Sequence, residues 1–123
     1  MEEANRQLEL RRRNVCLLAD SFADAGFVPV IDDVVASPGV LDLYLALLRT
    51  RPLRLVQLTP TIDVIQRRDA ERDKHVFDLW GHLHHDLHNR MARVGLWLDT
   101  SNLTAHQTVD AILDGFDRAL IAQ

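Results

Sequence analysis

The sequence predicts an α/β fold, a three-layer arrangement in which helices cover both faces of a parallel sheet. Three short apolar runs, at residues 27–31, 53–58 and 96–99, alternate with longer stretches in which apolar residues recur at helical spacing. Such alternation is typical of parallel sheets, because each crossover between parallel strands needs a helix-sized connection. The chain of 123 residues has the length of one domain, so we expect a single domain over residues 1–123.

The first half of the chain is expected to contain one strand between two helices. Apolar residues recur every seven positions and predict a helix over residues 2–25, which Gly26 ends. Residues 27–31 are continuously apolar, as in a strand that is buried on both faces. Pro29 removes one ladder hydrogen bond and favours an edge position. A Ser-Pro pair at residues 37–38 then supplies an N-cap and a first helical residue for the second helix.

The second half of the chain is expected to contain two strands and three helices. In chain order they are a strand at 53–58, a helix opened by Thr59 and Pro60, a helix at 77–93, a strand at 96–99 and a closing helix. Thr104 and Gln107 match the capping-box pattern at the start of the closing helix. The expected inner face of that helix is Val109, Ile112, Leu113, Phe116 and Leu120.

Composition and charge exclude several classes of function. Fourteen Lys and Arg residues against eighteen Asp and Glu give a net charge of −4, which argues against a nucleic-acid surface. We interpret the basic run at residues 11–13 as a solvated helix face. No apolar run approaches the roughly 20 residues that span a bilayer, and no signal-peptide core opens the chain, so we expect a cytoplasmic protein with no membrane partner. Cys16 is the only cysteine and lies among apolar residues, so we expect it to be buried.

Polar residues follow each expected strand. They are Asp32 and Asp33 after the first, Thr59 after the second, and Asp99, Thr100 and Ser101 after the third. The carboxyl ends of parallel strands meet at one edge of a sheet, where ligands bind in open α/β folds. The sequence therefore predicts a site along this edge.

Several stretches of the sequence together resemble a known family. The matching stretches are residues 56–60, 68–72 and 94–104, with 17–20, 25–27 and the run that ends at Asp33 upstream. In combination they resemble the C-terminal part of small P-loop phosphotransferases, the bacterial group related to chloramphenicol phosphotransferase and to shikimate and gluconate kinases. The resemblance implies ATP-dependent phosphoryl transfer to a small-molecule substrate, with magnesium as a cofactor.

The resemblance also implies a role for particular residues. Arg68 and Arg72, four apart on one helix, would stabilise the negative charge that develops on the transferring phosphoryl group. Asp33 would hold magnesium through water. The loop beside the nucleotide base would be Asp99, Thr100 and Ser101. From the residues alone, the favoured interpretation is that the two arginines pair with neighbouring carboxylates on a solvated helix.

One part of the family pattern is absent. No G-x-x-x-x-G-K-[ST] phosphate loop occurs, and the only lysine is Lys74. The resemblance implies that the first strand and this loop are missing, which would leave two strand edges open. We therefore expect the isolated chain to be inactive, and to form a homo-oligomer or to pair with a strand-donating partner.

Two other classes of function stay open. One is a non-catalytic remnant or interaction module that pairs through its open strand edges. The other is a metal-binding module built on the histidine cluster, in which His84 and His88 stand at i, i+4. The remaining members of that cluster are His82 and His85.

Overall fold

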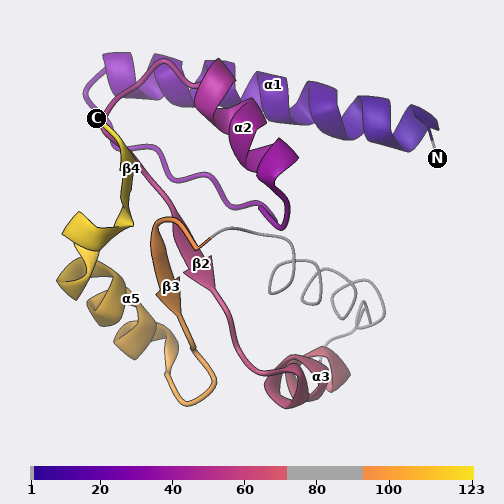
Figure 1. Cartoon of the computed structure of the whole chain (residues 1–123), viewed down its shortest axis with the longest axis vertical. Helices are drawn as coiled ribbons and strands as arrows, with labels where there is room; N and C mark the ends of the chain where they lie inside the picture. Colours follow the sequence, from indigo (N-terminus) through magenta and orange to yellow (C-terminus); the bar gives the residue numbers. More distant parts are fainter. Residues whose placement is uncertain (1, 72–92) are drawn as a thin grey trace. The chain divides into compact units, whose positions relative to one another are not determined.

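The computed structural model describes residues 2–71 and 93–123, which form helices and two small sheets (Figure 1). The chain divides into two compact units. The first contains Met1–Val34 and Gly39–Arg51, and the second contains Val35–Pro38 and Pro52–Gln123. Whether the two units unfold together is a question of cooperativity, so the expectation of a single domain stays a prediction.

The predicted three-layer parallel sheet is wrong. The described strands form two separate pairs: β1 (Leu53–Arg54) runs antiparallel to β4 (Leu120–Ala122), and β2 (Val56–Leu58) runs parallel to β3 (Leu96–Leu98). The apolar run at 53–58 is not one strand, because the chain changes partner at Leu55. The Leu55 N–H donates to the Ala119 carbonyl (2.9 Å), and the Leu55 carbonyl accepts from the Leu96 N–H (2.9 Å).

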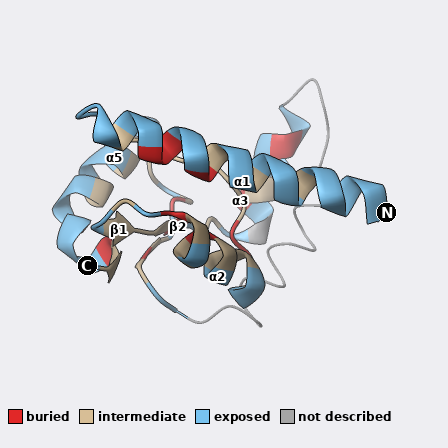
Figure 2. Cartoon of the chain, turned by 90° about the horizontal axis from the view of Figure 1, so that it is seen from above, coloured by how far each residue is buried: buried red, intermediate tan, exposed pale blue. Residues whose placement is uncertain are grey.

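The first helix confirms the prediction made from its periodicity. Helix α1 spans Glu2–Asp24, and Gly26 follows it with φ +94°, a backbone conformation that glycine adopts without strain. Figure 2 shows that α1 is exposed along most of its length. Its buried residues are Cys16, Ala19 and Asp20, which confirms the burial expected for the cysteine.

The strand predicted at residues 27–31 is absent. These residues belong to no sheet, and Val28 and Val30 are 85% and 89% exposed. No backbone hydrogen bond joins residues 28–32 to any other residue that the structure describes. Two causes are visible in the first unit: Pro29 has no N–H to donate, and no strand of that unit lies alongside.

The second helix begins where the Ser-Pro pair predicts. Helix α2 spans Pro38–Leu47, and the buried Asp20 carboxylate of α1 organises the turn that follows it. Asp20 accepts hydrogen bonds from the N–H groups of Arg49 (3.0 Å) and Thr50 (2.9 Å) and from the Thr50 hydroxyl (2.6 Å). Each hydrogen bond to a buried carboxylate stabilises the fold by about 1.5–3 kcal/mol.

The second unit contains two further described helices. Helix α3 spans Ile62–Ala70 with Thr61 as its N-cap, so it begins two residues after the predicted Thr59–Pro60 start. The predicted helix at 77–93 lies outside the described residues, except for Arg93 at its end, which is not helical. Helix α5 spans Ala105–Asp114 and confirms the capping box: Thr104 Oγ1 accepts from the Gln107 N–H (3.1 Å), and Gln107 Oε1 accepts from the Thr104 N–H (2.9 Å).

The predicted length and inner face of the closing helix are wrong. The helix ends at Gly115, and a short 3-10 helix (Phe116–Ala119) leads into β4. A Cβ at residue 115 would lie 2.9 Å from Cδ2 of Leu96, so a larger residue here would require the Leu96 side chain to shift. The expected inner-face residues that are instead exposed are Val109, Leu113 and Phe116.

No helix in the described ranges, 2–71 and 93–123, has the length and apolar character needed to cross a bilayer.

Candidate functional site

The carboxyl ends of β2 and β3 lie together, because the two strands are parallel and in register from Val56↔Leu96 to Leu58↔Leu98. Thr59, directly after β2, ties the two ends to each other. Its N–H donates to the Leu98 carbonyl at 2.7 Å, and its hydroxyl donates to the same oxygen at 3.1 Å. Polar residues that follow two different strands therefore meet at one edge, which we call the β2–β3 edge.

The loop at Asp99, Thr100 and Ser101 is fixed by its own side chains. Asp99 Oδ1 accepts hydrogen bonds from the Ser101 hydroxyl (2.5 Å) and the Ser101 N–H (2.9 Å). These two bonds hold the pKa of the Asp99 carboxyl below its usual range, so it is ionised at neutral pH. The Ser101 hydroxyl in turn accepts from the Thr61 N–H at 2.9 Å, which connects the loop to the start of α3.

Arg68 is the cation of this edge. Its guanidinium reaches from the last turn of α3 to the carbonyl oxygen of Thr100, at 3.0 Å from Nη2. Thr100 is only 5% exposed, whereas Arg68 is exposed. A guanidinium carries five N–H donors in a planar fork, and the other donors of Arg68 have no partner in the described part of the chain. The edge thus presents a guanidinium fixed to the carbonyl of Thr100, the residue that follows the ionised Asp99 in the sequence.

Of the residues that the sequence predicts for a nucleotide site, Arg68, Asp99, Thr100 and Ser101 are brought together. Arg72 lies outside the described residues, so the predicted pairing of two arginines on one helix face stays a prediction. Asp33 belongs to the first unit, and Arg68 and the loop belong to the second.

Asp33 forms a cluster with two residues that the sequence analysis did not assign to any site. Its Oδ2 accepts from Arg12 Nε at 2.7 Å and from the Tyr44 hydroxyl at 2.5 Å, and its Oδ1 accepts from the Val34 N–H at 2.7 Å. The side chains of Arg12 and Asp33 are 13% and 14% exposed, so this ion pair is largely buried. We call these three side chains, Arg12, Asp33 and Tyr44, the buried cluster.

The buried cluster shifts the pKa of all three of its members. Burial lowers the pKa of Arg12, but the hydrogen bond to Asp33 and the charge of that carboxylate outweigh it and raise the pKa. Burial raises the pKa of Asp33, but the hydrogen bonds from Arg12, Tyr44 and the Val34 N–H outweigh it and hold the pKa below its usual range. Burial, together with donation to the Asp33 carboxylate, raises the pKa of Tyr44 well above the usual range for a phenol. Both carboxylate oxygens are already engaged, one of them by a guanidinium, and this donor set does not suit a magnesium ion.

One signal in the sequence does point to Arg12. It lies four, seven and eight residues before Cys16, Ala19 and Asp20, so it shares a helix stripe with the residues that α1 buries. The basic run at 11–13 was interpreted as a solvated face, and for Arg12 that interpretation is wrong. Its neighbours Arg11 and Arg13 are exposed, as expected.

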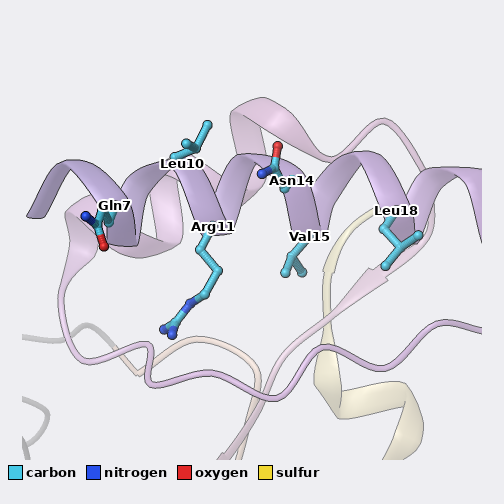
Figure 3. Close-up of a pocket in the computed structure, with 6 residues that line it drawn as sticks. All are labelled: Gln7, Leu10, Arg11, Asn14, Val15 and Leu18. Atoms are coloured by element: carbon cyan, nitrogen blue, oxygen red, sulfur yellow. The ribbon is translucent and has the colours of Figure 1, made fainter. Parts of the chain in front are cut away.

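The surface hollows of the first unit do not form an enclosed site. One, of about 300 Å³, is lined entirely by α1 residues, and Figure 3 shows Leu10 and Asn14 pointing away from Arg11 and Val15. A second, of about 400 Å³, lies between α1 and residues 29–32. Across the described ranges, no three metal-ligating side chains come together, and the histidine cluster at 82–88 lies outside those ranges.

Comparisons with models of protein families, with curated proteins and with solved structures found no match. The interpretation of the β2–β3 edge therefore depends on its geometry and on the resemblance of the sequence.

Proposed function

We propose that the chain takes part in nucleotide-dependent phosphoryl transfer to a small-molecule acceptor, and that it binds ATP at the β2–β3 edge. The observation that supports this proposal is the position of Arg68, an exposed residue whose guanidinium is fixed by one hydrogen bond to the carbonyl of the buried Thr100. This hydrogen bond lowers the entropy that the side chain loses when it binds an anion. The N–H groups of Arg68 that have no partner among residues 2–71 and 93–123 match phosphate oxygens. The edge also follows two parallel strands, whose carboxyl ends bring polar residues from two parts of the chain together.

Each end of the site suits a different part of a nucleotide. Arg68 would bind the phosphates, with Arg72 as a second cation. The loop at Asp99 and Ser101 would face the ribose or the base, since an ionised carboxylate accepts hydrogen bonds from hydroxyl and amino groups. Inorganic phosphate could use only the guanidinium end of the site, because the ionised Asp99 carboxylate has no hydrogen bond to donate to an anion.

Transfer of the phosphoryl group needs more than this edge supplies. Phosphotransferases of the resembled group stabilise the β- and γ-phosphates with a glycine-rich loop and its lysine, and these 123 residues contain no such motif. A test of these 123 residues should therefore measure the binding of ATP and not the transfer of its phosphoryl group.

Isothermal titration with ATP tests the proposal, with Arg68→Ala as the variant and Arg67→Ala as its control. Both changes remove one positive charge from α3, and both arginines are exposed, but only Arg68 is bonded to the loop. Loss of charged hydrogen bonds to phosphate should weaken binding about 10- to 100-fold in Arg68→Ala and only slightly in Arg67→Ala. Absence of ATP binding by the unaltered chain, or equal losses in the two variants, would contradict the proposal.

A further inference from the structure

Residues 27–31 form an apolar segment of the first unit whose backbone is unpaired. Val28 and Val30 are 85% and 89% exposed, Phe27 is 65% exposed, and no charged residue occurs between Asp24 and Asp32. Apart from the Phe27 N–H, which donates to the Phe22 carbonyl, these residues make no backbone hydrogen bond within the described structure. Soluble chains protect such segments with charges, bulges or a covering element, because exposed strand backbone pairs readily with other strands.

Pro29 restricts the backbone at the centre of this segment. Its ring fixes its own φ near −65° and disfavours the helical region for Val28. These two residues therefore lose less conformational entropy than ordinary residues when they enter a sheet.

The two edges of the segment differ in their capacity to pair. In an extended strand, the N–H and C=O groups of one residue point to the same edge, and those of the next residue point to the other. Val28 and Val30 share one edge, on which every donor and acceptor is present. Pro29 lies on the opposite edge, where its missing N–H interrupts the ladder. Only the edge of the two valines can support continuous pairing.

We propose that residues 27–31 pair antiparallel with the same segment of a second copy of this chain, about a two-fold axis at Pro29. In this register Val28 of one chain faces Val30 of the other, and each such pair exchanges both of its backbone hydrogen bonds. The two prolines face each other at the centre, at a non-hydrogen-bonded position that needs no N–H. The segment is thus complementary to itself, as a two-fold interface requires.

The surface beside the segment continues the same apolar character. The hollow of about 400 Å³ between α1 and residues 29–32 is lined by Leu18 and Phe22 of α1, which are 59% and 49% exposed. Contiguous exposed apolar surface of this kind marks interaction sites in soluble proteins. A second copy would remove from water both the valine pairs and part of this neighbouring surface.

Charge variants at the two valines test both the partner and the register. Val28→Lys/Val30→Lys places like charges opposite each other across the pair, and Val28→Lys/Val30→Glu places opposite charges there. Both double variants remove the same apolar side chains, and neither should disturb the fold, because these side chains are almost fully exposed. Far-UV circular dichroism checks that the fold is retained.

Sedimentation velocity of the full chain from about 1 µM to about 1 mM gives the dissociation constant of the dimer. We expect the unaltered chain to dimerise, and the Lys/Lys variant to dissociate about tenfold more readily than the Lys/Glu variant. A mixture of Lys/Lys and Val28→Glu/Val30→Glu chains should dimerise where each alone stays monomeric. A monomeric unaltered chain, or equal dissociation constants for Lys/Lys and Lys/Glu, would overturn the proposal.

Discussion

Removal of the Asp33 carboxylate is expected to be among the most destabilising single changes in the first unit. In Asp33→Ala, the Arg12 guanidinium loses its counter-ion while its side chain stays only 13% exposed. The Tyr44 hydroxyl and the Val34 N–H lose their acceptor at the same time. These groups come from α1, from α2 and from the segment between them, so the change disconnects three parts of the unit.

The size of the effect follows from burial. Breaking a buried ion pair by removing one partner costs about 3–5 kcal/mol, since the remaining charge is left in a poorly hydrated position. Tyr44→Phe removes one hydrogen bond to a charged acceptor that still holds Arg12, and should cost about 1–2 kcal/mol. The stability lost in Asp33→Ala is a large share of the free energy of unfolding of a whole domain, which is typically about 5–15 kcal/mol.

Urea denaturation followed by far-UV circular dichroism measures the free energy of unfolding for each variant. Asp24→Ala is the matched control: Asp24 and Arg49 also lie 2.7 Å apart, but their side chains are 60% and 65% exposed, so little stability should be lost. The double variant Arg12→Met/Asp33→Ala should be more stable than Asp33→Ala, because it leaves no unpaired charge.

Protonation of the Asp33 carboxylate at low pH should destabilise the folded chain, as its removal does. The pKa of Asp33 is lower in the folded chain than in the unfolded chain, so its contribution is present above about pH 4 and is lost as the pH falls through the folded pKa. Asp33→Ala should abolish this part of the acid dependence. If Asp33→Ala is no less stable than Asp24→Ala, the carboxylate is not structural and the reasoning about the buried cluster is refuted.

Three further predictions concern two glycines, the capping box of α5 and the Tyr44 phenol. Gly95→Ala should cost at least about 2 kcal/mol in thermal or urea unfolding, because residue 95 has φ +79° and a Cβ would lie 2.5 Å from the Leu55 carbonyl oxygen. Gly39→Ala, where a Cβ meets nothing within 4 Å, should instead be neutral or stabilise by up to about 1 kcal/mol, and the opposite order would contradict the geometry. Thr104→Ala should cost about 1 kcal/mol through loss of the capping box, and Thr104→Ser should restore most of it. The Tyr44 phenol, the only one in the chain, should ionise well above pH 10 in a near-ultraviolet absorbance titration. The pKa of Tyr44 is higher in the folded chain than in the unfolded chain, so the free energy of unfolding should fall as the pH rises above about 10. Ionisation of the phenol near pH 10 would show that the hydroxyl is not buried.

Local chemistry was predictable from the sequence. Gly26 ends α1, Pro38 begins α2, and Thr104 with Gln107 caps α5, as expected. Each of these features depends on backbone conformation or hydrogen bonding within a few residues. Such signals can therefore be recognised in the sequence without knowledge of how the rest of the chain folds.

Strand pairing was predicted poorly, because it depends on distant partners. The apolar run at 27–31 fits a buried strand, but no strand of its unit pairs with it. The run at 53–58 changes its pairing partner at Leu55, because the Leu55 backbone bonds to Ala119 through its N–H and to Leu96 through its carbonyl. Gly115, the C-cap of α5, is a local signal for the end of the closing helix that the apolar spacing of residues 109–120 does not reveal.

The candidate site was predictable in part. Polar residues after β2 and β3 do meet, because a parallel pair brings its carboxyl ends together. The bond from Arg68 to the Thr100 carbonyl joins residues 32 positions apart, and no spacing rule predicts it. The same is true of Arg12 and Asp33, which are 21 positions apart and become a pair only when the chain folds back along α1.

A nuclear magnetic resonance titration of the isotopically labelled chain with ATP tests the nucleotide site most directly. We expect the largest amide shift changes at residues 59–61 and 99–101 and at Arg68, with the changes lost in Arg68→Ala and kept in Arg67→Ala. Inorganic phosphate at the same concentration should cause much smaller changes. Shift changes confined to other parts of the chain, or none at all, would contradict a nucleotide site at the β2–β3 edge.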